Sequence, residues 1–186
     1  MRKILLVLAI TFLSICSIAQ SVERLDFKFS DNPVFSDTLK VGDANTIILE
    51  QKFSVEYAYE DAILYAYTLI HKRRRLITDK GVEQSNKVYM SINGGDELIS
   101  HGARVIQSDG EIVTLGEEAI EEGVDEESGG TYKYFAFEGI EKGSDIEYFY
   151  FVKRVANSSY TGRALFVQGA TDASNVNFEI ITPDNL

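Results

Sequence analysis

Residues that could perform nucleophilic or acid–base chemistry are scarce in this sequence. Its 186 residues include one cysteine, Cys16, and two histidines, His71 and His101. A catalytic thiolate needs an imidazole beside it, and Cys16 lies in an apolar N-terminal stretch that we expect to be removed. No Gly-x-Ser-x-Gly sequence positions a serine nucleophile. We therefore predict no catalytic residue and interpret both histidines as ordinary surface residues.

Carboxylates are plentiful, and they gather over residues 117–127 (EEAIEEGVDEE). Calcium binds clustered oxygen ligands, but this run lacks the alternating ligand spacing of an EF-hand loop. Too few cysteine and histidine residues exist for a zinc site. We interpret 117–127 as a solvated acidic loop, with a calcium site and a partner-facing patch as alternatives. No metal or cofactor is expected.

Tyrosines supply the candidate contact surface, which comprises Tyr57, Tyr59, Tyr65 and Tyr67. Exposed aromatic rings can stack on sugars or contact proteins, although cross-strand packing is a commoner use. The absence of tryptophan makes the sugar interpretation weaker. A basic run, Lys72–Arg75, lies nearby, and in a strand its members point alternately to two faces. We expect this run to balance the charge of the acidic loop.

The charge balance excludes some partners. Eighteen Lys and Arg stand against 29 Asp and Glu, giving a formal net charge of −11. Nucleic-acid binding depends on basic residues that neutralise phosphates, so we expect no nucleic-acid partner. Binding to anionic lipid is disfavoured for the same reason. An acidic surface would instead steer basic protein partners.

The N-terminus predicts export. Arg2 and Lys3 precede an apolar stretch, Ile4–Ile15, which is too short to span a bilayer. Small residues before Gln20 complete a signal peptide over 1–19, with cleavage between Ala19 and Gln20. Lipidation of Cys16 is the alternative. The signal peptide leads us to expect a periplasmic or extracellular protein. No second apolar run is long enough to span a membrane.

The remaining sequence indicates an irregular arm over 20–45 and a β domain over 46–183. Period-two alternation begins near residue 47, and aromatic strands are expected at 132–137 and 145–152. Further predicted strands are 88–92, 103–106, 112–115, 164–167 and 176–180, with Asp109-Gly110 as a hairpin turn. Residues 63–70 lack a polar stripe and fit a helix or a strand equally well. About nine short strands predict a two-sheet antiparallel β-sandwich.

Four segments together resemble a known family. They are DAN followed by IILEQ near 43–51, HKRRRLITDKG at 71–81, ARVI with SDG at 103–110, and FEGIEKGSDIEY at 137–148. In order and spacing they are similar to the domain of unknown function 3857. This module stands N-terminal to a papain-like transglutaminase domain in exported bacterial proteins. The resemblance spans about 43–183, and the chain stops before the catalytic Cys, His and Asp of that second domain.

The resemblance implies a β-sandwich in which 63–78 is a strand paired with 46–58. It implies no activity, because none is established for the module. We therefore expect a non-catalytic accessory or docking module, with a transglutaminase-like domain or another envelope protein as its partner. The alternative is a glycan- or peptide-binding module that uses the tyrosines or an open sheet edge. An enzyme is the third and least favoured interpretation.

Overall fold

The computed structural model describes residues 27–33, 43–124, 130–156 and 172–184. The signal segment with its Ala19–Gln20 site, and the strand expected at 164–167, lie outside these residues. Within them the chain forms nine strands and two short helices. The strands are β1 (Thr46–Glu60), β2 (Ile63–Leu76), β3 (Lys87–Tyr89), β4 (Glu97–Ile106), β5 (Ile112–Thr114), β6 (Ile120–Val124), β7 (Thr131–Ala136), β8 (Asp145–Val155) and β9 (Val176–Ile181). The helices are α1 (Asp79–Glu83) and a 3-10 turn over Glu117–Ala119.

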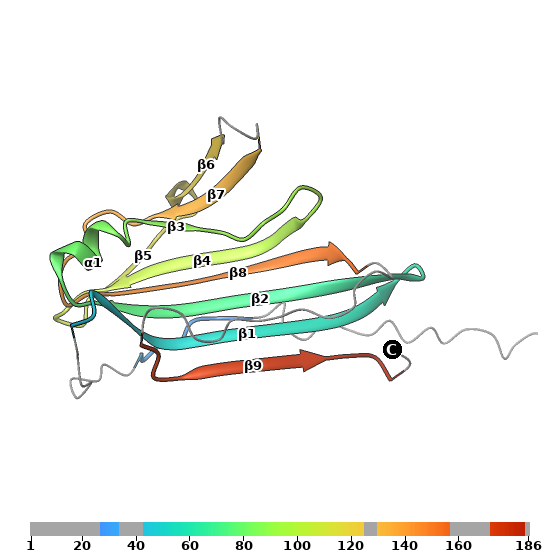
Figure 1. Cartoon of the computed structure of the whole chain (residues 1–186), viewed down its shortest axis with the longest axis horizontal. Coiled ribbons are helices and arrows are strands. Elements are labelled where there is room, and N and C mark those ends of the chain that lie inside the picture. The colour runs from blue at the N-terminus through green and yellow to red at the C-terminus, as the bar shows by residue number, and fades with distance from the viewer. Residues whose placement is uncertain (1–26, 34–42, 125–129, 157–171, 185–186) are drawn as a thin grey trace, which may run out of the picture.

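The strands form two sheets, which confirms the all-β, two-sheet prediction (Figure 1). The larger sheet has the order β5-β4-β8-β2-β1-β9, and the smaller has the order β3-β7-β6. All pairs of named strands are antiparallel except β1 and β9, which run parallel. A parallel neighbour needs a long connection rather than a tight turn, and most of the chain separates β1 from β9.

The segment that fitted helix and strand equally is a strand. β2 pairs along its whole length with β1, from Glu60↔Ile63 to Thr46↔Leu76. Asp61 and Ala62 make the turn with φ angles of 48° and 64°. Two central residues with positive φ match the right-handed twist of a tight hairpin. β2 lacks a polar stripe because it is central, with buried residues on both faces.

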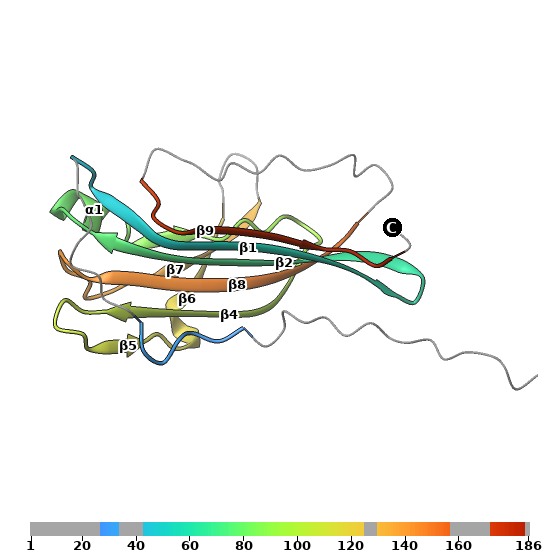
Figure 2. The ribbon, with the colours of Figure 1, turned by 90° about the horizontal axis from the view of Figure 1, so that it is seen from below.

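The core between the sheets lies over β4 and β8. It is a cluster of buried residues that includes Val88, Ala103, Val105, Phe135, Phe137, Ile146, Tyr148, Tyr150 and Val152. Among the described residues, no residue of β1 or β9 belongs to this cluster. Figures 1 and 2 accordingly show the small sheet on the β4 side, with β9 forming the opposite edge of the large sheet.

The acidic run differs from the expected loop. Glu117–Ala119 is a 3-10 turn, and β6 pairs with β7 from Ile120↔Phe135 to Val124↔Thr131, whereas 125–127 lie outside the described residues. The pairing arises because Ile120 packs on the core while Glu121 and Glu122 stay exposed. Neither helix in the described part of the chain has the length or apolar content to cross a bilayer.

Candidate functional site

The basic run of β2 divides between the two faces of the large sheet. His71, Arg73 and Arg75 are buried on one face, whereas Lys72 and Arg74 point to the other, where the small sheet packs. β8 follows the same alternation, since Glu147 pairs with Arg73 and Tyr148 pairs with Lys72. Two chemically different sites therefore lie back to back.

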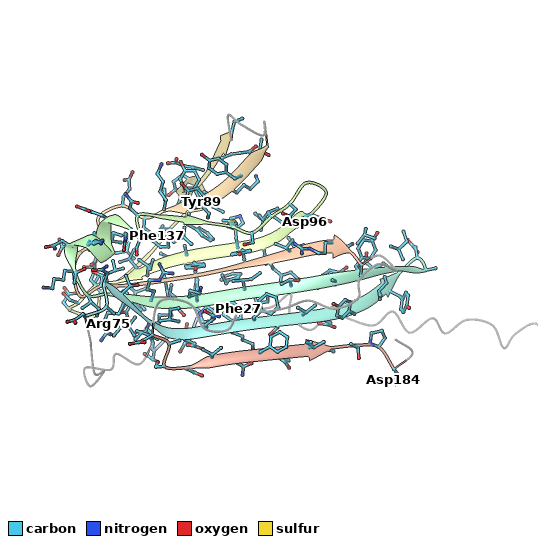
Figure 3. All side chains as sticks on the ribbon, in the orientation of Figure 1. Phe27, Arg75, Tyr89, Asp96, Phe137 and Asp184 are labelled. Carbon is cyan, nitrogen blue, oxygen red and sulfur yellow. The ribbon has the colours of Figure 1, made fainter. Side chains whose placement is uncertain are left out.

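The first site, the charged cluster, comprises His71, Arg73, Arg75, Arg104, Asp145 and Glu147. Asp145 is fully buried and accepts hydrogen bonds from both neighbouring arginines of β2. Its Oδ2 lies 2.6 Å from Arg73 Nη2, and its Oδ1 lies 2.7 Å from Arg75 Nε. Figure 3 shows Arg75 at the end of the sheet nearest α1. Charge-assisted pairs of this geometry fix the register of β2 against β8.

Glu147 occupies the second half of the cluster and joins β8 to β2 and β4. Arg104 Nε donates to its Oε2 at 2.7 Å, and His71 Nε2 lies 2.8 Å from its Oε1. Burial alone would raise the pKa of Glu147, but the hydrogen bonds from His71 and Arg104 outweigh it and lower the pKa. The carboxylate is thus held ionised with its oxygens occupied, which suits a structural role better than that of a general base.

The segment 27–33 covers the charged cluster. The ring of Phe27 lies 4.8 Å from His71 and 4.9 Å from Phe149, measured between centroids. Phe29 lies 4.7 Å below the guanidinium carbon of Arg104. The prediction of a surface His71 is therefore wrong, because this histidine is 3% exposed. His101 is half-buried, with its ring 6.3 Å from that of Phe135.

The partners of the basic run also differ from expectation. Arg73 and Arg75 share the carboxylate of Asp145 in β8, a partner that the sequence interpretation did not include. The strand register causes this, because it places Asp145 directly across from Arg75. Sequence reasoning missed Asp145 and Glu147, although two carboxylates on one face of an aromatic strand were the available signal.

The second site is a groove of about 310 Å³ on the other face, between the large sheet and β3. Its walls include Phe53, Ile70, Lys72, Tyr89, Tyr148 and Arg154. Tyr89 marks the small-sheet side in Figure 3. None of the described residues that line the groove is Asp or Glu. This is unusual in a chain with 29 acidic residues.

The cations on this face of β2 and in the groove are incompletely neutralised. Lys72 is half-buried, and its pKa is lowered by burial and by the charge of Arg74. Among the described residues, no carboxylate pairs with either Lys72 or Arg74. Arg74 Nε is buried without a hydrogen-bond partner in the part of the chain described. Arg154 differs, because its Nη2 binds Asp96 Oδ2 at 2.6 Å.

An exposed apolar stripe continues from the groove to the edge of the large sheet. Val176, Phe178 and Ile180 of β9 are 40%, 44% and 55% exposed. Phe178 stacks on Phe53, with ring centroids 5.7 Å apart, and Phe53 lines the groove. Groove and stripe thus form one continuous surface on the face opposite the charged cluster.

The four candidate tyrosines do not form one surface. Tyr57 and Tyr59 point to the groove face, whereas Tyr65 and Tyr67 point to the cluster face, because Tyr57 pairs with Ala66 and Ala58 pairs with Tyr65. Tyr67 is buried and donates to Glu60. Lys153 Nζ lies 4.2 Å from the centre of the Tyr65 ring. Tyr59, at 43% exposed, is the most accessible of the four.

A further pocket of about 480 Å³ lies between the β4–β5 hairpin and β7. Its rim carries Glu118, Glu121 and Glu138 above an apolar floor that includes Val105 and Leu115. Within the described ranges, no group of three His, Cys, Asp or Glu side chains is placed to hold a metal ion.

Comparison with protein families agrees with the sequence resemblance. The model described as "Domain of Unknown Function with solved-structure structure (DUF3857)" matches residues 65–186, which is more than half of the chain. The chain therefore belongs to this family. None of the curated proteins compared with the sequence matches it.

A solved structure shares the fold. It is the crystal structure described as that of a "putative protease" from Parabacteroides distasonis ATCC 8503, with a TM-score of 0.64 and 14% sequence identity. The similarity covers 76% of this chain and 29% of that one. The present chain thus spans less than a third of the length of its structural relative.

Proposed function

We propose that this protein is a non-catalytic docking module that binds a protein partner through the surface formed by the groove and the β9 stripe. The exposed stripe on β9 is the observation on which this proposal rests. Three apolar side chains on one face of an edge strand are each at least 40% exposed, and such a row beside a groove is typical of an interaction surface. An edge strand also offers free backbone groups for strand addition.

The chemistry of the buried groups supports a role by contact rather than by catalysis. The two carboxylates of the charged cluster are occupied by arginine and histidine donors. Phe27 and Phe29 lie over the cluster, so a substrate would have to displace them. His101 has an aromatic neighbour, Phe135. A general base needs an acceptor that a substrate can reach, and the unpartnered Nδ1 of His71 is buried.

The proposed partner is an exported catalytic domain of the transglutaminase-like kind, or another envelope protein. Two observations support this choice. The resemblance noted in the sequence implies such a domain beside the module, and the matched fold occupies 29% of a longer chain whose description is a putative protease. Export of this chain is part of the proposal and rests on the N-terminal pattern ending at Ala19.

The experiment immobilises the purified protein and captures partners from the exported fraction of its source cells. Phe178→Asp places a charge in the stripe, whereas Val113→Asp places the same charge at an equally exposed site on β5. We expect the wild type and Val113→Asp to retain one identifiable protein that Phe178→Asp loses. Equal capture by Phe178→Asp, or robust turnover of ester, peptide or glycoside substrates by the purified chain, would contradict the proposal.

A further inference from the structure

The groove contains positive charge that the described part of the fold leaves unneutralised. Lys72 and Arg74 lie two residues apart on the same face of β2, which separates their Cα atoms by about 7 Å. Like charges at this separation repel, and partial burial increases the cost. The same strand shows the opposite arrangement on its other face, where Arg73 and Arg75 share Asp145.

Polar groups around Lys72 are placed to assist an anion. Gln51 and Tyr148 pair with Lys72 from β1 and β8, so the three residues form one row across the sheet. All three line the groove. Burial raises the pKa of Tyr148 to about 12, so its hydroxyl stays protonated at neutral pH and can donate a hydrogen bond.

The next row of the groove is apolar. Phe53, Ile70 and Tyr150 follow Gln51, Lys72 and Tyr148 at the adjacent inward positions of β1, β2 and β8. Tyr150 is anchored, because its hydroxyl accepts a hydrogen bond from the Ser91 amide at 3.1 Å. Row spacing along a strand is about 7 Å, the same as the spacing of residues i and i+2 in an extended peptide.

We propose that the groove binds an extended acidic peptide segment, with a carboxylate over Lys72 and an apolar side chain two residues away against Phe53 and Ile70. This inference rests on the docking function and specifies the chemistry of the partner. Charge complementarity selects the carboxylate, since the described groove lining holds cations and no acid. The apolar row selects a peptide over a simple anion. The apolar stripe on β9 extends the same surface for flanking residues.

The experiment measures binding of two blocked tripeptides to the purified full chain. The probes are acetyl-Glu-Thr-Phe-amide and its matched control acetyl-Gln-Thr-Phe-amide, with inorganic phosphate as a third probe. A charge-assisted hydrogen bond predicts that the Glu peptide binds about tenfold more tightly than the Gln peptide. Amide chemical shifts should change at Thr68, Lys72 and Tyr150 and not in β5.

Two protein variants localise the effect. Lys72→Met should lower the affinity for the Glu peptide about tenfold, to that of the Gln peptide. Lys142→Met removes the same charge from an exposed turn and should change nothing. Lys72→Gln is the second groove variant if Lys72→Met does not fold. Equal binding of both peptides, phosphate binding as tight as that of the Glu peptide, or an unchanged affinity in the groove variants would overturn the proposal.

These results are separable from the docking function. In one outcome, capture of a protein depends on Phe178 while the Glu peptide binds no more tightly than the Gln peptide. That outcome would leave the docking surface in place and remove only its proposed preference for carboxylates. Specific binding of the Glu peptide without any captured protein would leave the groove as a carboxylate site and contradict the docking role.

Discussion

The two faces of β2 treat positive charge in opposite ways. Arg73 and Arg75 point into the charged cluster, where Asp145 accepts hydrogen bonds from both. Lys72 and Arg74, the residues interleaved with them, point to the opposite face, where Lys72 lines a groove with no described carboxylate in its lining. Burial makes unneutralised charge costly, so a fold usually supplies a partner. The cluster therefore stabilises the fold, whereas the groove keeps a positive charge that a bound partner could neutralise.

The largest effect is expected on the cluster side, from Asp145→Asn. This substitution keeps the shape of the side chain but removes the negative charge that two buried arginines share. Breaking a buried pair by removing one partner costs about 3–5 kcal/mol, and we expect the free energy of unfolding to fall by that amount. Urea denaturation measures it. A loss below about 1 kcal/mol would mean that the cluster does not hold the strands together.

The cluster should also make stability depend on pH. Glu147 has a lowered pKa in the folded protein, so the folded state favours its ionised form. The resulting stabilisation is complete above the unfolded pKa, near 4.3, and is lost as pH falls through the folded pKa. We expect the free energy of unfolding to decrease below about pH 4.5.

The control for this pH dependence is Glu147→Gln, which cannot ionise. It should be less stable than the wild type at pH 7, and its stability should change less between pH 5 and pH 3. Parallel pH curves for the two proteins would show that Glu147 does not contribute.

Much of the fold could be predicted from sequence because its strands have clear periodicity. The strands predicted at 132–137 and 145–152 from their aromatic residues correspond to β7 and β8, and the predicted hairpin around Asp109-Gly110 joins β4 to β5. Residues 63–76 required the family resemblance, because a central strand buried on both faces has no period-two signal. The parallel partner of β1 could not be predicted, since pairing across the whole chain leaves no local pattern.

The candidate site was less predictable for a physical reason. Whether a charge is neutralised depends on strand register, and the sequence of a single segment does not determine the register. The alternation of Lys72–Arg75 between two faces was predicted, but the identity of Asp145 as counter-ion was not. The tyrosines show the same limit, because the tight turn at Asp61–Ala62 sends Tyr57 and Tyr65 to opposite faces.

The smallest effect is expected at the exposed pair of Lys133 and Glu122. Their side chains are 41% and 53% exposed, and the charged atoms are 3.1 Å apart. Glu122→Gln should change the free energy of unfolding by less than about 0.5 kcal/mol, because water screens exposed pairs. A thermal or urea melt measures this, and high salt should leave the difference near zero. A large loss would show that the cluster is not special among the ion pairs of this protein.

The most direct test compares Arg73→Met with Lys72→Met, two adjacent residues of one strand that face opposite sites. Both substitutions remove one positive charge and retain an unbranched side chain. We expect Arg73→Met to lower the free energy of unfolding by about 3 kcal/mol, because it breaks a buried ion pair. Lys72→Met should raise the same quantity by about 1 kcal/mol, because it removes a half-buried cation repelled by Arg74. Losses of similar size in both variants would show that the groove charge is already neutralised within the fold, which would contradict the account.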